Sequence, residues 1–87
     1  MRFSDMPREV QRFLFLHRLT DNLLKAIPCK EGEPYIVGEK YYSGFWFYVY
    51  EVLSVNGREV TIKKQSGEIV THCVPLCCVD WHFIKAT

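Results

Sequence analysis

The first third of the chain places apolar residues at the three- and four-residue spacing of an α-helix. When the residues from Met6 to Ile27 are set at 100° intervals, one wide apolar stripe forms opposite a polar face. Pro28 cannot continue this helix, because proline has no backbone N–H. We therefore predict an amphipathic helix over residues 5–27, with Phe15 lying on its polar face.

After residue 34 the apolar spacing changes from the period of a helix to the period of two that is typical of strands. The run Phe45–Val55 is rich in aromatic and β-branched residues. The Asn56-Gly57 pair that follows favours a tight type I′ hairpin. Five strands are predicted in all: Tyr35–Tyr42, Phe45–Val55, Glu59–Lys64, Glu68–Val74 and Val79–Ile84.

These elements predict an α+β fold. We expect one domain over residues 1–87, in which the N-terminal helix is followed by a β-unit over about residues 35–84. The spacing of the strands resembles that of SH3-like small β-barrels, here with an N-terminal helix. The resemblance implies a five-stranded antiparallel barrel, and a curled open sheet covered by the helix on one face is the alternative. No SH3 ligand-groove motif matches in register, so the resemblance implies no binding residues.

Aromatic residues are unusually frequent and suggest a binding surface. They make up 15% of the 87 residues, which is more than a core of this size easily buries. In a strand over Phe45–Tyr50, alternate residues would face opposite sides, so both faces would be aromatic. Either both faces are covered, or one is an exposed strip. On the second interpretation the partner-binding residues are Trp46, Tyr48, Tyr50, Phe15 and Lys63.

A cluster of cysteine and histidine residues near the C-terminus raises the question of a metal site. Four such ligands could hold zinc, but the spacing contains no Cys-x-x-Cys knuckle, and reduced cysteines also behave as small buried hydrophobes. Core cysteines are therefore the preferred interpretation. The zinc alternative would use Cys73, Cys77, Cys78, His72 and His82.

The sequence contains no phosphate-binding loop, cofactor fingerprint or paired-carboxylate motif. A nucleophilic site would need a base and an oxyanion hole at defined positions, which residue types alone do not supply. We therefore predict a protein that is not an enzyme and needs no cofactor.

Charge and hydropathy limit the partners. The formal charge is only +1, from 11 basic and 10 acidic residues, whereas nucleic-acid binders more often show a clustered basic excess. No apolar run approaches the ~18–20 residues that span a bilayer, and no signal peptide is recognised at the N-terminus. We expect a cytoplasmic protein with reduced thiols and no membrane partner.

The leading functional hypothesis is a protein-binding module or stand-alone inhibitor. Such proteins are frequent among bacteriophage and mobile-element products that act on a host enzyme or defence complex. The alternative is a nucleic-acid-binding small β-barrel that uses the aromatic strip with flanking lysines, Lys63 and Lys64. A second alternative is a zinc- or thiol-dependent protein. A homodimer, paired through a free strand edge near Tyr41–Tyr50, competes with a foreign partner.

Overall fold

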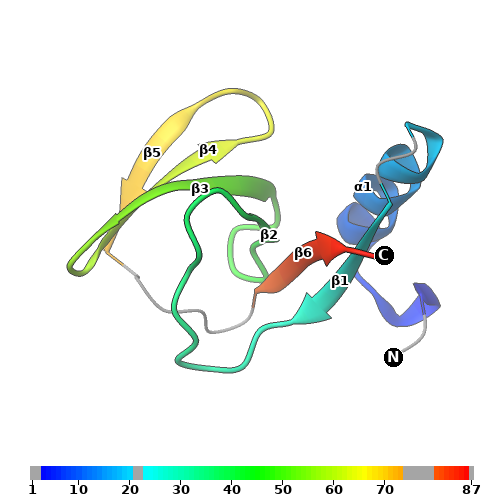
Figure 1. The fold of residues 1–87 in the computed structure, drawn as a ribbon, viewed down its shortest axis with the longest axis horizontal. Helices are drawn as coiled ribbons and strands as arrows, with labels where there is room; N and C mark the ends of the chain where they lie inside the picture. Colours follow the sequence, from blue (N-terminus) through cyan, green and yellow to red (C-terminus); the bar gives the residue numbers. More distant parts are fainter. Residues whose placement is uncertain (1–2, 21–22, 74–79, 87) are drawn as a thin grey trace.

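The chain folds into one N-terminal helix and an antiparallel sheet, so the predicted α+β class is confirmed (Figure 1). The structure is a computed structural model that describes residues 3–20, 23–73 and 80–86. A short 3-10 turn over Phe3–Asp5 precedes α1, which spans Arg8–Leu19. The six strands are β1 (Leu24–Pro28), β2 (Lys40–Tyr42), β3 (Val49–Asn56), β4 (Glu59–Lys64), β5 (Ile69–His72) and β6 (Trp81–Lys85).

Helix α1 is shorter than the sequence predicts. It ends at Leu19, and the hydroxyl of Thr20 donates a hydrogen bond to the carbonyl of His17 at 3.2 Å. The prediction that the helix continues to residue 27 is wrong, because Leu24–Pro28 is the strand β1 and pairs along its whole length with β6. A short apolar run is compatible with a helix or a strand, and here pairing with a strand more than 50 residues away makes it a strand.

The sheet has the strand order β1-β6-β2-β3-β4-β5, with every neighbouring pair antiparallel. Within the described ranges no pairing joins the two edge strands, β1 and β5, so the sheet is open and has six strands instead of the five predicted. The free edge expected near Tyr41–Tyr50 does not exist, because β2 lies between β6 and β3, and β3 lies between β2 and β4. That route to a homodimer is therefore closed.

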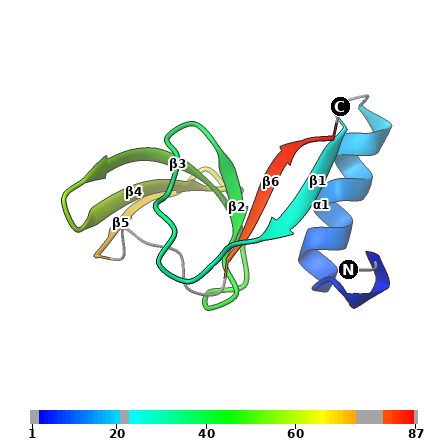
Figure 2. The same cartoon turned by 60° about the horizontal axis from the view of Figure 1, so that its bottom comes forward.

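Each face of the sheet carries a hydrophobic core. On one face, α1 packs its Val10, Phe13 and Leu14 against the sheet. Figure 2 shows α1 alongside β1 at one end of the sheet, with β3, β4 and β5 curving away at the other end. The opposite face carries a second core, which consists of Tyr35, Tyr41, Tyr50, Val52, Val60 and Ile62. Two cores explain how so short a chain buries many of its aromatic residues.

Strand β3 begins four residues later than predicted. Gly44, Phe45 and Trp46 form a turn, and the extended backbone starts at Val49. From there the alternation holds, because Val49 packs in the core under α1 and Tyr50 packs in the core on the opposite face. The hairpin to β4 is also confirmed. Its two central residues are Gly57 and Arg58, and a positive φ at Gly57 alone indicates a type II′ turn instead of type I′.

No helix in the described part of the chain is long and apolar enough to cross a membrane.

Candidate protein-binding surface

The segment Ser43–Tyr48, which joins β2 to β3, is held in one conformation by its first residue; we call it the aromatic loop. Ser43 is fully buried, and its Oγ accepts hydrogen bonds from the backbone N–H of Phe45 at 3.2 Å and of Trp46 at 2.9 Å. Its carbonyl accepts from the N–H of Phe47 at 2.9 Å, and its own N–H donates to the carbonyl of Tyr48 at 2.9 Å. One serine therefore satisfies three backbone donors of the turn and one backbone acceptor.

Two phenylalanine rings project from the aromatic loop into solvent. Phe45 is 67% exposed and Phe47 is 69% exposed. Phe47 has φ +60°, and it is the one residue other than glycine with a positive φ in the described segments. A side chain with a Cβ is strained by about 1–2 kcal/mol in this left-handed region. The chain therefore maintains a strained backbone at the position where it exposes an aromatic ring.

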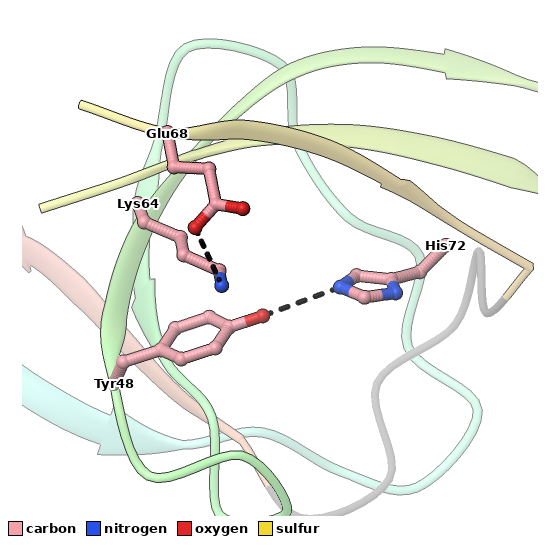
Figure 3. A network of polar contacts seen from close by, with 4 residues as sticks. All are labelled: Tyr48, Lys64, Glu68 and His72. Carbon is pink, nitrogen blue, oxygen red and sulfur yellow. Dashed lines mark hydrogen bonds and ion pairs between the residues drawn. The ribbon is translucent and has the colours of Figure 1, made fainter. Parts of the chain in front are cut away.

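The other two aromatic residues of the loop, Trp46 and Tyr48, stack on neighbouring rings, and Figure 3 shows Tyr48 beside His72, Lys64 and Glu68. The ring of Trp46 lies parallel to that of His72, with centroids 4.2 Å apart, and also stacks on Tyr48 at 6.1 Å. The Tyr48 hydroxyl and His72 Nε2 share a hydrogen bond of 3.2 Å. Lys64 places its ammonium 4.9 Å from the centre of the Tyr48 ring and pairs with Glu68 at 3.1 Å. This stack fixes the loop against β4 and β5.

Tyr50 has a different environment from Trp46 and Tyr48. It is 2% exposed, and its hydroxyl donates to Oδ2 of the buried Asp80, which also accepts from Tyr35 at 2.9 Å. Burial raises the pKa of Tyr50 far above its usual value of 10, and the nearby Asp80 carboxylate adds to the rise. Burial also raises the pKa of Tyr48. The Tyr50 ring lies in the core and has almost no exposed area with which to contact a partner.

The other predicted binding residues lie elsewhere. Lys63 is exposed, but it stands opposite Glu51, whereas Lys64 stands opposite Tyr50 and shares its face. Lys64 is therefore the lysine that reaches the aromatic stack. Phe15 is 57% exposed on α1 and belongs to a second surface beside β1.

Of the residues in the zinc alternative, His72 is stacked on Trp46. His82 is stacked on Tyr41, with its Nε2 3.8 Å from a carboxylate oxygen of Glu39. Cys73 is exposed, while Cys77 and Cys78 lie outside the described residues. Among residues 3–20, 23–73 and 80–86, no three His, Cys, Asp or Glu side chains lie close enough to hold a metal ion.

Comparison of the chain with protein-family models, with curated proteins and with solved structures finds no match. The class is therefore defined by the architecture alone: a small α+β protein with one helix and an open six-stranded antiparallel sheet.

Sequence reasoning selected Trp46 and Tyr48 but assigned Phe45 and Phe47 to the opposite face of a strand. The strand propensity of Phe45–Tyr48 hid the turn, because aromatic residues favour strands wherever a partner strand is available. Ser43-Gly44, just before the run, was the available sign of a turn, since serine and glycine both favour turns.

Proposed function

We propose that this chain is a non-enzymatic protein-binding module and that the aromatic loop contacts its partner. The observation that carries the proposal is Phe47, whose ring is 69% exposed while its backbone has φ +60°. Strain of this kind persists where surrounding contacts hold it, and it concentrates at functional sites. Asparagine or glycine would adopt the same backbone at lower cost. A contact between the Phe47 ring and a partner molecule would explain why phenylalanine occupies this position.

The way in which the loop is held also supports binding. Four hydrogen bonds at Ser43 and the stack of Trp46 on His72 order the loop in the free protein. A preorganised loop loses little conformational entropy when it binds, so more of the contact energy contributes to affinity. Aromatic side chains are enriched in the buried centres of protein interfaces, which makes Phe45 and Phe47 suitable anchors for apolar pockets on a partner.

The order of the strands supports the further proposal that the β-unit is an SH3-like fold. The order β6-β2-β3-β4-β5 places the last strand beside the first of a four-strand meander, and β1 would then be an added edge strand. A domain with one rigid aromatic loop would act by occupying a site on its partner, so we favour an inhibitor or adaptor role.

A photo-crosslinking experiment in the native host tests the proposal. The photoreactive residue p-benzoylphenylalanine is introduced at Phe45, and at Ile69 in a matched control, because Ile69 is also exposed and apolar but lies on β5. We expect one protein to crosslink at position 45 and not at position 69. The same protein, once purified, should bind the wild-type chain and lose at least about tenfold in affinity to Phe47→Asn. Equal crosslinking at both positions, or unchanged affinity for Phe47→Asn, would contradict the proposal.

The nucleic-acid alternative has its own measurement. The Trp46 ring is already stacked on His72 and Tyr48, and Lys64 is paired with Glu68. Both arrangements leave less of the stack for bases and phosphates. Binding of a fluorescent single-stranded oligonucleotide at low salt, weakened by added salt, would favour that alternative over ours.

A further inference from the structure

The edge strand β1 directs part of its backbone away from the sheet. The ladder between β1 and β6 is bracketed by two hydrogen bonds: Ala86 N–H to Leu23 carbonyl at 3.1 Å and Cys29 N–H to Asp80 carbonyl at 2.8 Å. In an antiparallel pair, every second residue of a strand bonds to the partner strand, and the backbone groups of the residues between them point away from it. The backbone groups of Leu24 and Ala26 therefore point outward, and within the described residues their N–H groups have no partner.

A groove of about 740 Å³ lies between this edge and α1. The helix lines it with Leu14, Phe15 and Arg18, and the strand lines it with Leu24, Lys25 and Ala26. Phe15 and the neighbouring Leu23 are exposed large apolar residues. Outward backbone donors and an apolar wall thus share one concave surface.

The groove is positively charged, which favours an acidic ligand. Arg18 and Lys25 are its two charged lining residues, and neither has an ion-pair partner in the ranges that the structure describes. Lys85, which lies opposite Leu24 on β6, is exposed as well. A second copy of the chain would bring the same positive charges together, whereas acidic side chains would neutralise them.

We propose that this groove binds an extended peptide segment in which apolar residues alternate with Asp or Glu, added to the sheet as a strand beside β1. In this mode main-chain hydrogen bonds hold the peptide and its alternate side chains give specificity. The N–H groups of Leu24 and Ala26 would donate to carbonyls of the peptide. Its apolar side chains would pack on Phe15 and its acidic ones would face Lys25. This surface is separate from the aromatic loop, so each proposal can fail without the other.

A fluorescein-labelled peptide of alternating Glu and Val tests the inference by fluorescence anisotropy. Ala26→Pro removes an outward N–H, and proline is tolerated at edge positions of this kind, as Pro28 two residues later shows. We expect it to weaken binding at least about tenfold, a change of ~1.4 kcal/mol. Lys25→Glu should weaken binding to a similar degree and allow a Lys-Val peptide to bind instead. Lys63→Glu, a charge reversal on β4, is the matched control and should leave the affinity unchanged.

A second arm keeps the test decisive if Ala26→Pro loses its circular dichroism signal. A peptide methylated on every second backbone nitrogen, prepared in both registers, should bind the wild-type protein in one register only. Absence of binding at 1 mM peptide, or equal binding by both methylated registers, would overturn the inference. Sedimentation of the wild-type chain alone as a dimer, dissociated by Lys25→Glu or Ala26→Pro, would also overturn it and assign the groove to a second copy.

Discussion

The strain at Phe47 can be measured by two substitutions that remove the same ring. Phe47→Ala and Phe47→Asn both delete the aromatic side chain, but asparagine adopts the left-handed backbone more readily than alanine. The ring is 69% exposed, so about a third of it is buried. Full burial of phenylalanine is worth ~1.5–3 kcal/mol, and each variant should therefore lose ~0.5–1 kcal/mol of packing.

The backbone contribution separates the two variants. Phe47→Ala keeps a residue with an ordinary Cβ at φ +60° and should be destabilised by the full ~0.5–1 kcal/mol. Phe47→Asn relieves roughly 1 kcal/mol of strain and should unfold within ~0.5 kcal/mol of the wild type. Phe47→Gly should lie between them, because the gain in backbone freedom is offset by ~0.5–1 kcal/mol of unfolded-state entropy.

Urea unfolding followed by far-ultraviolet circular dichroism measures these differences directly. A common slope with urea would show that the variants unfold from similarly compact states. For a chain of this size, 1 kcal/mol corresponds to a shift in Tm of about 4–8 °C, which thermal unfolding resolves. If Phe47→Ala proved as stable as Phe47→Asn, the left-handed backbone would not be a source of strain, and the argument for a functional ring would fail.

The other predictions concern the groups that hold the loop and the core. Ser43→Ala leaves the N–H groups of Phe45 and Trp46 without their acceptor, and should cost ~1–3 kcal/mol in urea unfolding; an unchanged stability would mean that Ser43 does not hold the loop. Tyr50 has a pKa raised above the unfolded value of 10, so its contribution is complete below pH 10. Above pH 10 the unfolded state releases the proton first, and stability should fall by ~1.4 kcal/mol per pH unit from this group. Tyr50→Phe should flatten this alkaline decline while lowering stability at pH 7, since Asp80 loses one donor; an identical decline in both proteins would assign it to other groups.

Local patterns in the sequence were sufficient for the elements whose interactions are also local. The three- and four-residue spacing from Val10 to Leu14 identified the buried face of α1. The alternation of Val60 and Ile62 with exposed Lys63 identified the inner face of β4, and Gly57 marked the hairpin before it. These features depend on side-chain period and on backbone conformations that one or two residue types favour.

Tertiary pairing decided the rest. Leu24–Pro28 became a strand because β6 supplied its hydrogen-bond partners, and only its place at the edge of the sheet created the groove beside Phe15. Within one aromatic run, Phe47 lies on the surface and Tyr50 lies in the core because Ser43 turns the chain before β3 begins. The sequence by itself determined that some aromatic residues lie at the surface, since there are more of them than one small core holds. Which of them face solvent depended on contacts between segments far apart in the chain, and no local period records those contacts.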